Sequence, residues 1–545
     1  AGSGAGQVLR PCVGLRNRRM SASAFLLRDL SVEGTDRTWL RNVYNATELP
    51  PLTAPVVFLA DCLTMYAGKY IRYNATAQQA MLPSIATLAG VLGAVPLDVG
   101  GTHTPLPREA TACVFDATIT FGTDASNTSA LEATRYVFEH HVNETSGLAK
   151  LNPGYQSQSG KAIIHPVIVG GPSTELIDYV VYAKLFDLYL PDACLPLTQQ
   201  HALFKQIAAQ NPWPKPLAVM GYDNSFVIQG GDFFEAETLC DIGQGMGQIA
   251  SAGSANLAYW TTERPHINSP LEKNPDLDTV YNASKTYIAF LIGDGDNVDY
   301  IQGGRMRWMN ERTAQCDDPK RGCHFPLLWT MSPHILKLSP AYFHWYNAQL
   351  LRTKLDRFAL PPSGDLYAYP SLFPDDQQDT YVRNTERDAE LLSTKVTTAW
   401  EWALSWGHAL KHYFPKYAKT GIINALVAVN VPYNLPVLAF GNDKFKVMEQ
   451  AANRSVVFAP HEWRGTRGSK IPFANEENLN VTAMAKEING YPKGTVTAIY
   501  LTSDGGGNLE DINELVNLLN ANVVVVGNNI GDMALAASGA RPESR

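Results

Sequence analysis

The chain has 545 residues, of which 45% are hydrophobic and 18% charged, and it carries a formal net charge of −8. A chain of this length predicts roughly two or three domains. The acidic balance argues against nucleic acid as the main partner, because binding to phosphates requires a basic surface. No uninterrupted apolar stretch reaches about 18 residues, so we expect no transmembrane segment.

The N-terminal half begins with a basic segment and continues with alternating strand and helix patterns. Residues 1–28 contain five arginines and no acidic residue, which predicts a flexible basic arm. Apolar runs that predict strands fall at 55–60, 112–115, 162–169 and 217–220. Helical spacing falls at 77–91, 130–141, 175–188 and 234–250. This alternation predicts βαβ units and a mainly parallel sheet, and therefore a Rossmann-like α/β domain over residues 29–265.

Residues 266–285 are rich in Pro, Asn and Asp, which predicts a linker. Beyond it, strands are predicted at 287–292, 325–331, 366–369, 423–431, 455–459, 497–501 and 523–527. Helices are predicted between them, notably at 389–412 and 509–520. Six or seven β/α units over residues 286–545 predict a (β/α) barrel-like domain, with a second doubly wound sheet as the alternative.

The most informative segment is the Gly-Asp-Gly-Asp-Asn run at 293–297, which follows a strongly apolar predicted strand. Polar groups at the carboxyl end of a parallel strand reach the binding crevice of an α/β fold. The alternative is a purely structural tight turn, in which the Asp and Asn side chains accept hydrogen bonds from nearby backbone amides. A cation loop is disfavoured because Val298 stands where an EF-hand would place an oxygen ligand. The D-x-D spacing is also found in glycosyltransferases that bind a metal–nucleotide-sugar complex. We expect no metal and no cofactor.

A second segment at 364–370 places Tyr367 and Tyr369 between a glycine and a proline. Residues at i and i+2 of an extended segment point to the same side. The two rings therefore predict an exposed surface on which a sugar stacks.

These two segments carry a family resemblance. Gly364-Asp365-Leu366-Tyr367-Ala368-Tyr369-Pro370 resembles the signature of the GxGYxYP putative glycoside hydrolases, and the 293–297 run resembles the "DGDN" segment upstream of that signature. The chain departs from the pattern at Leu366, which replaces the second glycine and would restrict the backbone if a positive φ were needed. The resemblance covers residues 30–530 and implies a hydrolase without naming its substrate.

Hydrolysis of a glycosidic bond usually requires two carboxyl groups, one as acid and one as base or nucleophile. We predict Asp296 and Glu462 as this pair, with Asp294 as a further candidate, because each follows a predicted barrel strand. Trp463 beside Glu462 would desolvate the carboxyl group and raise its pKa, although Glu462 could equally be an exposed loop acid. The predicted substrate contacts are Asn297, Tyr367, Tyr369, Trp329, Trp463 and Asp504. Trp400, Trp402 and Trp406 lie within the helix predicted at 389–412 and are expected to be structural.

The cysteines and glycosylation motifs predict a secreted or extracellular glycoprotein. Cys316 and Cys323 bracket a turn-rich loop suited to a local disulfide. Two further bridges are expected among Cys62, Cys113, Cys194 and Cys240, which leaves Cys12 unpaired. There is no C-x-x-C pair, which argues against structural zinc. The seven N-x-[ST] motifs begin at Asn45, Asn74, Asn127, Asn143, Asn282, Asn453 and Asn480.

We therefore predict a glycoside hydrolase that acts on an unidentified glycan through carboxylate chemistry, with carbohydrate as its partner. The alternative is a non-catalytic secreted glycoprotein that binds glycan or self-assembles into an extracellular structure, since a fold can outlast its catalytic site.

Overall fold

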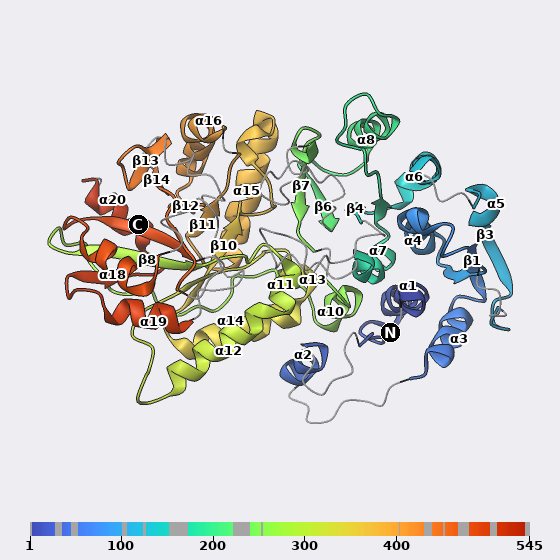
Figure 1. Ribbon diagram of the computed structural model, residues 1–545, viewed down its shortest axis with the longest axis horizontal. Coiled ribbons are helices and arrows are strands. Elements are labelled where there is room, and N and C mark those ends of the chain that lie inside the picture. Colours follow the sequence, from blue (N-terminus) through green and yellow to red (C-terminus); the bar gives the residue numbers. More distant parts are fainter. Residues whose placement is uncertain are drawn as a thin grey trace. The chain divides into compact units, whose positions relative to one another are not determined.

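The structure is a computed structural model that describes residues 3–27, 35–44, 53–100, 106–123, 127–151, 173–221, 240–251, 254–402, 404–429, 439–450, 453–466, 479–501 and 509–539. The chain divides into two compact units. The first comprises Ala1–His266 and Ile335–Tyr342, and the second comprises Ile267–His334 and Phe343–Arg545 (Figure 1). Among the described helices, none is long and apolar enough to cross a membrane.

The first unit is a mixture of α-helices and short parallel strands. Its helices are α1 (Ser3–Met20), α2 (Thr35–Tyr44), α3 (Pro55–Met65), α4 (Leu82–Leu92), α5 (Ala117–Thr120), α6 (Asn127–His141), α7 (Ile177–Ala183), α8 (Gln199–Gln210), α10 (Leu257–Glu263) and α13 (Ile335–Leu338), with 3₁₀ turns η1 (Gln79–Met81), η2 (Val142–Glu144) and η3 (Ser173–Leu176). Its strands are β1 (Lys69–Tyr73), β2 (Val95–Asp98), β3 (Ala112–Asp116), β4 (Leu148–Lys150), β5 (Phe186–Leu188), β6 (Leu217–Gly221) and β7 (Met246–Ile249).

These strands form two separate parallel sheets, with the orders β2-β1-β3 and β5-β4-β6-β7. In each sheet the strand that comes first in the sequence pairs with the second on one side and the third on the other. Parallel neighbours of this kind need a crossover between them, and helices supply the crossovers here. The α/β character predicted for this region is confirmed, although the strands occupy two sheets.

The predicted basic arm is wrong, because residues 3–20 form helix α1. Cys12, Val13 and Leu15 are buried, and Gly14 allows a close approach to α7, since a Cβ there would lie 2.1 Å from the Asp178 carbonyl oxygen. Arg18 donates to the carbonyl oxygens of Gly90 at 2.7 Å and Val181 at 3.2 Å. These acceptors belong to the last turns of α4 and α7, where carbonyl groups lack a partner within the helix. The Arg18 guanidinium group therefore provides hydrogen-bond donors and a positive charge at the C-terminal ends of two helices.

Two further predictions for this unit are corrected. Residues 55–60, predicted as a strand, begin helix α3, in which Pro55 occupies one of the first helical positions, where its missing N–H costs nothing. The helix predicted at 234–250 is replaced at its end by strand β7. The predicted strand at 162–169 lies outside the described residues.

The disulfide pairing differs in part from the prediction. Cys316–Cys323 is confirmed, and the other two bonds are Cys12–Cys62 and Cys194–Cys240. Cys113 is therefore the free cysteine, and it is exposed. The expectation that Cys12 is unpaired fails because Cys12 lies within α1, which packs against α3 and so faces Cys62.

The Cys12–Cys62 bond closes a sequence separation of 50 residues. On the chain-entropy model a loop of this size predicts a loss of about 4 kcal/mol when the bond is removed. We expect the double substitution Cys12→Ser/Cys62→Ser to lower the thermal unfolding midpoint of the protein clearly. Cys113→Ser is the matched control and should leave it within about a degree, since surface changes cost little. Equal midpoints for the two variants would contradict the prediction.

The second unit has one large sheet surrounded by helices. Its strands are β8 (Thr286–Ile292), β9 (Leu328–Thr330), β10 (Arg357–Pro362), β11 (Val396–Ala399), β12 (Ala425–Ala428), β13 (Phe445–Gln450), β14 (Asn453–Phe458), β15 (Glu462–Trp463), β16 (Val496–Leu501) and β17 (Val523–Val525). Its helices are α11 (Val298–Gln302), α12 (Gly304–Asp317), α15 (Asp375–Leu391), α16 (Trp406–His408), α18 (Val481–Asn489), α19 (Leu509–Asn517) and α20 (Ile530–Ala537), with shorter turns η5 (Pro370–Leu372), η6 (Ala409–Tyr413) and η7 (Phe414–Lys419). Helix α14 (Pro340–Thr353) begins in the first unit and continues in the second.

The sheet order is β13-β14-β12-β11-β10-β9-β8-β16-β15, and β17 pairs with the first half of β8. Every pair is parallel except β13–β14. Only residues 459–461 separate β14 from β15, although these strands pair with β12 and β16 respectively. The sheet therefore curls until both ends of its parallel part are joined by one short stretch of chain.

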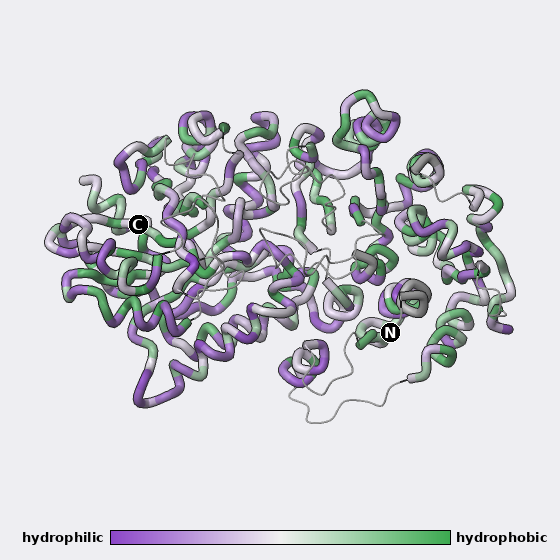
Figure 2. Tube along the Cα trace, in the orientation of Figure 1, coloured by the Kyte–Doolittle hydropathy of each residue, from purple (hydrophilic) through white to green (hydrophobic). Residues whose placement is uncertain are grey.

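One face of this sheet forms the core of the unit. Alternate residues of β8, such as Tyr287, Ala289 and Leu291, pack with residues from β9–β12, β14, β16 and helix α20. Figure 2 shows these strands as predominantly hydrophobic tubes. Residues 266–285 are predicted as a linker, but from Ile267 onward they belong to the second unit. The Asn274 side-chain amide donates to the Leu350 and Asp356 carbonyl oxygens at 2.8 and 2.9 Å.

Two element predictions for this unit are also corrected. The strand predicted at 366–369 is instead a loop, because β10 has already ended at Pro362. The long helix predicted at 389–412 is interrupted by strand β11, whose residues Val396, Thr397 and Thr398 are β-branched and favour a strand. As a consequence, Trp400 and Trp402 follow the carboxyl end of a strand.

Candidate functional site

The 293–297 loop is held rigidly against the neighbouring strand β9. The Gly295 amide donates to the Thr330 hydroxyl at 3.0 Å, and that hydroxyl donates to the Ile292 carbonyl oxygen at 2.6 Å. The Ser332 amide donates to the Gly295 carbonyl oxygen at 2.6 Å. A Cβ at Gly295 would lie 1.9 Å from the Thr330 carbonyl oxygen, so only glycine fits. These contacts therefore fix the position of the loop at this edge of the sheet.

Tyr500 of β16 supports the same loop from its other side. The Asp294 amide donates to the Tyr500 hydroxyl at 2.9 Å, and Asp294 has a positive φ of 59°. A Cβ at Gly293 would lie 2.5 Å from the Tyr500 ring. Both glycines of the run thus permit a close contact, one with β9 and the other with Tyr500. Tyr500 is not among the residues predicted for the site, although the strand at whose end it lies is predicted.

Three carboxyl groups act on the Tyr500 hydroxyl. Glu462 is the direct partner of Tyr500 in the β15–β16 ladder, and paired residues of neighbouring strands share a face of the sheet. The pKa of Tyr500 is raised well above its ordinary value, mainly by burial and then by the negative charges of Asp294, Asp296 and, more weakly, Glu462. The structure therefore brings together the three acids that the sequence predicts as catalytic.

The surroundings of Asp296 favour the protonated form of its carboxyl group. Burial, followed by repulsion from Asp294, raises its pKa to about 7, and the charge of Arg305 opposes this rise only in part. Arg305 is completely buried and donates to the Ile292 and Gly293 carbonyl oxygens. Asp296 as a whole residue is only partly buried, although its surroundings are dry enough to raise the pKa of its carboxyl group.

Three of the predicted substrate contacts have structural roles. The Asn297 side-chain oxygen caps helix α11 by accepting from the Asp299 and Tyr300 amides at 2.9 and 3.3 Å. Trp329 and Trp463 are fully buried, and their indole N–H groups donate to Asp356 at 3.1 Å and to the Leu479 carbonyl oxygen at 2.8 Å. Trp463 does not flank Glu462 as expected, because successive strand residues point to opposite faces. Asp504 lies outside the described residues.

The signature loop after β10 tolerates its departure from the family pattern. Gly364 has the positive φ, 100°, whereas Leu366 is not among the residues with positive φ. The Leu366 amide donates to the Tyr381 hydroxyl at 3.0 Å, and that hydroxyl also donates to the Ser363 carbonyl oxygen at 3.1 Å. Leucine at this position therefore causes no backbone strain of the kind that the sequence suggests.

The signature tyrosines belong to an aromatic cluster with Trp400 and Trp402. Tyr367 meets Trp400 edge-on with ring centroids 4.4 Å apart, and Tyr369 lies 5.5 Å from Trp400 and 5.9 Å from Trp402. Tyr369 is buried, whereas Tyr367 and Trp402 are partly exposed. The exposed sugar surface predicted for both tyrosines is thus available at Tyr367 but not at Tyr369. Trp402 is a further partly exposed ring, although the helix predicted at 389–412 led to the expectation that it is structural.

Glu401, between these two tryptophans, is a buried acid that is not among the residues predicted for the site. It accepts from the Ser371 amide at 2.9 Å, the Ser371 hydroxyl at 2.6 Å and the Ser405 hydroxyl at 3.2 Å. Burial raises its pKa to about 8, against the opposing effect of these hydrogen bonds. The helix predicted at 389–412 concealed the signal that identified Asp294 and Asp296, namely an acid close after a strand.

His334 and Asp365 form a second polar cluster at this edge of the sheet. His334 Nε2 donates to the Asp365 carbonyl oxygen at 2.7 Å and lies 3.4 Å from its carboxylate. The Asn384 amide donates to the other carboxylate oxygen at 3.1 Å. Asp365 occupies a variable position of the signature, and His334 follows β9, so neither motif pointed to this pair.

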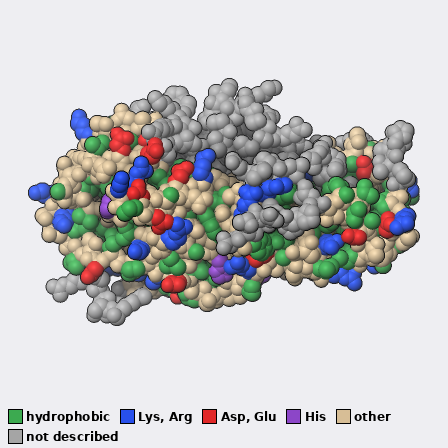
Figure 3. All heavy atoms as spheres, turned by 90° about the horizontal axis from the view of Figure 1, so that it is seen from below, with side chains coloured by type: hydrophobic (Ala, Val, Ile, Leu, Met, Phe, Trp, Pro, Cys, Tyr) green, Lys and Arg blue, Asp and Glu red, His purple; other side chains and the backbone are tan. Residues whose placement is uncertain are grey.

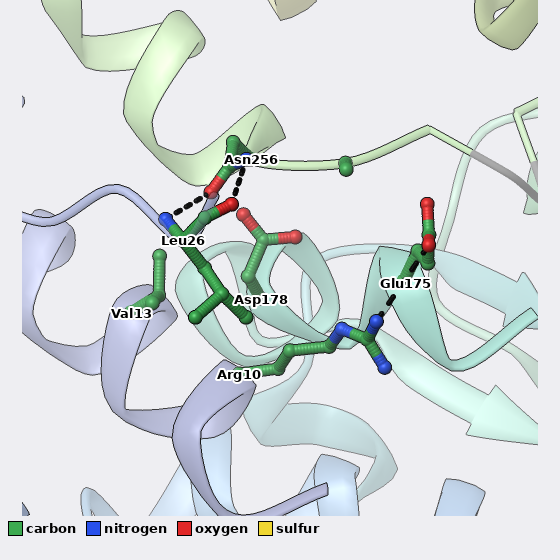
Figure 4. Close-up of a pocket in the computed structure, with 7 residues that line it drawn as sticks. Arg10, Val13, Leu26, Glu175, Asp178 and Asn256 are labelled. Atoms are coloured by element: carbon green, nitrogen blue, oxygen red, sulfur yellow. Dashed lines mark hydrogen bonds and ion pairs between the residues drawn. The ribbon is translucent and has the colours of Figure 1, made fainter. Parts of the chain in front are cut away.

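The first unit contains a small pocket near α1 and α7 (Figure 4). Arg10 and Glu175 approach to 3.7 Å at one end, and Asn256 binds the Leu26 backbone at the other. Asp178 is buried there and accepts from the Ala258 amide at 3.0 Å, so it ties α7 to the start of α10. Burial raises its pKa to about 7. These contacts give the pocket a role in packing. In the part of the chain that the structure describes, no cluster of three or more His, Cys, Asp or Glu side chains is suited to a metal ion.

Polar and aromatic side chains thus gather at the ends of β8, β10 and β16, at one edge of a parallel sheet. Residues 284–530 match the model of the GxGYxYP putative glycoside hydrolase C-terminal domain, which confirms the family resemblance for this part of the chain. A crystal structure of a putative hydrolase from Bacteroides thetaiotaomicron is similar in fold, with a TM-score of 0.66 and 17% identity, over 98% of this chain and 93% of that chain. No curated protein matches the chain significantly.

The contact between Gly295 and Thr330 leads to a prediction about loop packing. Gly295→Ala would force a methyl group against the Thr330 carbonyl oxygen, so we expect a loss of about 2 kcal/mol or more in the free energy of unfolding. Gly407→Ala is the control, because a Cβ there meets nothing within 4 Å. Denaturant unfolding of both variants checks this, and an undisturbed Gly295→Ala protein would show that the loop is not held as described.

The raised pKa of Glu401 leads to a prediction about pH and stability. The folded protein keeps this proton up to about pH 8, whereas the unfolded chain releases it near the ordinary value for glutamate. The resulting stabilisation is present at low pH and is lost as the pH rises towards 8 and above. We expect Glu401→Gln to reduce the fall in the thermal midpoint between about pH 5 and about pH 9. The control is Glu272→Gln, which changes an exposed acid. Its thermal midpoint should fall with pH as much as that of the wild-type protein.

Proposed function

We propose that the second unit hydrolyses a glycosidic bond at the carboxyl ends of its parallel strands, in a (β/α) barrel-like setting, and that the first unit is a Rossmann-like domain. The convergence of Asp294, Asp296 and Glu462 on Tyr500 is the observation that carries this proposal. Asp296 keeps its proton up to about neutral pH and has other carboxyl groups beside it, which suits glycoside hydrolysis, since that reaction needs an acid and a second carboxyl group.

In this mechanism Asp296 is the general acid. With a pKa of about 7 it is largely protonated below neutral pH and can transfer its proton to the leaving oxygen as the glycosidic bond breaks. Glu462 is the second carboxyl group, which attacks the sugar or activates water, with Asp294 as the alternative in this role. Arg305 and the Tyr500 hydroxyl hold the loop that carries Asp294 and Asp296.

The partly exposed Tyr367 and Trp402 are proposed as the surface on which a sugar ring stacks. Their rings belong to a packed cluster with Tyr369 and Trp400, so little side-chain entropy is lost when a ligand binds. Among the other predicted contacts, the Asn297 amide group remains proposed as a contact beyond its role as a cap.

We further propose that the protein is secreted or extracellular and N-glycosylated, which its three disulfide bonds support. Among the described motifs, Asn143, Asn282 and Asn480 are exposed, whereas the Asn453 amide already donates to the Lys419 carbonyl oxygen at 2.8 Å. On the face drawn in Figure 3, charged side chains of both signs are interspersed over the described residues.

Asp296→Asn tests the proposed acid. We expect turnover to fall by a factor of about 100 or more, because the amide cannot donate an acidic proton. For the wild-type protein, the rate should fall as the pH rises above about 7, since only protonated Asp296 is active. A broad screen of oligosaccharide and 4-nitrophenyl glycoside substrates provides the assay. Asp278→Asn, which changes an exposed acid of the same unit, should keep wild-type turnover.

Tyr367→Ala separates hydrolysis from glycan binding alone. We expect glycan binding on an array to weaken about tenfold, because stacking on one aromatic ring is worth about 1–3 kcal/mol. Binding that depends on Tyr367 without cleavage of any bound glycan would favour the non-catalytic alternative. Wild-type levels of binding in the variant would remove Tyr367 from the site.

A further inference from the structure

His334 has one ring nitrogen committed to Asp365 and the other open. Nε2 makes the two contacts with Asp365 at 2.7 and 3.4 Å. Within the described part of the chain, Nδ1 has no hydrogen-bond partner, and the side chain is 22% exposed. A histidine oriented through one nitrogen by an acid, with the other nitrogen open, is the usual arrangement of an acid–base or hydrogen-bonding group in an active site.

Asp365 is itself held from several sides, so the orientation of His334 is well defined. Its carboxylate accepts from Asn384 at 3.1 Å, and its amide donates to the Thr385 hydroxyl at 3.3 Å. Gly364, the residue before it, packs so closely on Thr385 that a Cβ would lie 2.4 Å from a Thr385 methyl group. Asp365 therefore acts as a fixed support for the imidazole ring.

The pair lies beside the loop that carries Asp296. Ser332, which lies just before His334, donates its amide to the Gly295 carbonyl oxygen at 2.6 Å. Gly295 in turn is the neighbour of Asp296 in the sequence. The two loops are thus in direct contact through backbone atoms, and His334 belongs to the same edge of the sheet as the proposed acid.

We propose that His334 is a substrate-binding residue that donates a hydrogen bond from Nδ1 to an oxygen atom of the bound glycan, with Asp365 as its positioning residue. This rests on the proposed function. The protonated ring carries hydrogen on both nitrogens, so Nε2 keeps Asp365 while Nδ1 donates. When the ring loses a proton, the hydrogen on Nε2 stays with Asp365, and Nδ1 becomes an acceptor.

The charged groups around His334 favour the protonated ring. Burial alone lowers its pKa, but the hydrogen bond and charge of Asp365, followed by the charge of Asp388, outweigh burial and raise it above the ordinary value. Arg387 supports this indirectly, because it favours the charged forms of both Asp365 and Asp388, although burial and the charge of Asp365 still raise the pKa of Asp388 to about 7. Binding should therefore be strongest at or below neutral pH and weaken as the pH rises through the pKa of His334.

The first test needs no substrate. Titration of the His334 ring by NMR, in the full-length protein, should give a midpoint above that of an ordinary histidine. Asp365→Asn should lower this midpoint by about one unit or more, because it removes the neighbouring negative charge. Asp376→Asn, which changes an exposed acid on α15, should leave it unchanged. Equal midpoints in the wild-type and Asp365→Asn proteins would overturn the pairing.

The second test measures binding on a glycan array in the Asp296→Asn background, so that bound glycan is not cleaved. Adding His334→Gln should weaken binding about tenfold at about pH 6, and the difference should shrink at about pH 9, where wild-type His334 no longer donates. Glutamine can still bind Asp365, so folding should be kept, and His324→Gln serves as the exposed-histidine control. Unweakened binding, or a loss that is the same at both pH values, would overturn the role of His334.

The outcomes for the two proposals remain distinguishable. If the wild-type protein binds glycan but cleaves none, hydrolysis fails and the His334 proposal is still judged by its own pH-dependent effect on binding. If no glycan is bound at any pH, the sugar-binding role of His334 is overturned together with the proposed function, whatever the NMR titration shows.

Discussion

The close contact of the 293–297 loop with β9 and Tyr500 is the constraint on which the rest of the site depends. Gly295 is pressed against the Thr330 backbone, and Gly293 is pressed against the Tyr500 ring. These contacts fix the backbone on both sides of Asp294 and directly before Asp296. A longer or freer loop could not hold two carboxyl groups close enough for one to raise the pKa of the other, because that repulsion weakens with distance and solvation.

Burial then gives neighbouring acids different protonation states at one edge of one sheet. The pKa of Asp296 is raised to about 7, mainly by burial and by Asp294. Asp365 is also buried, but its pKa is lowered, because His334, Arg387 and Asn384 stabilise its charge. A protonated acid and a paired carboxylate can therefore coexist near neutral pH. This separation of roles by environment is the general way in which proteins obtain an acid and a base from the same residue type.

The curled sheet accounts for how residues distant in the sequence share this edge. β8 pairs with both β9 and β16, so Asp296, His334 and Tyr500 follow or end neighbouring strands. The short connection between β14 and β15 then brings Glu462 opposite Tyr500. The likeness to the crystal structure from Bacteroides thetaiotaomicron shows that this fold is shared at 17% identity. At that identity the fold is established, and the chemistry rests on the residues themselves.

The sequence alone determined the α/β class, the strand before the 293–297 run, the local disulfide Cys316–Cys323 and the family resemblance confirmed over residues 284–530. These features depend on local patterns, such as a continuous apolar run, a turn-rich loop or a fixed motif. The sequence also placed Asp294, Asp296 and Glu462 among the candidate acids, because each lies near the end of an apolar strand.

Only the tertiary structure decided which partners these residues have. Residues 1–28 are predicted as a flexible basic arm because their arginines suggest exposure to solvent. Arg18 instead binds the ends of two helices that come much later in the chain. The pairing of Cys12 with Cys62 likewise required the packing of α1 on α3. Trp329 and Trp463 are predicted as substrate contacts but are core residues. Their burial depends on how the sheet packs, which the sequence does not show. Tyr500, Glu401 and His334 escaped notice for the same reason: each has a distinctive environment only because residues far apart in the sequence meet around it.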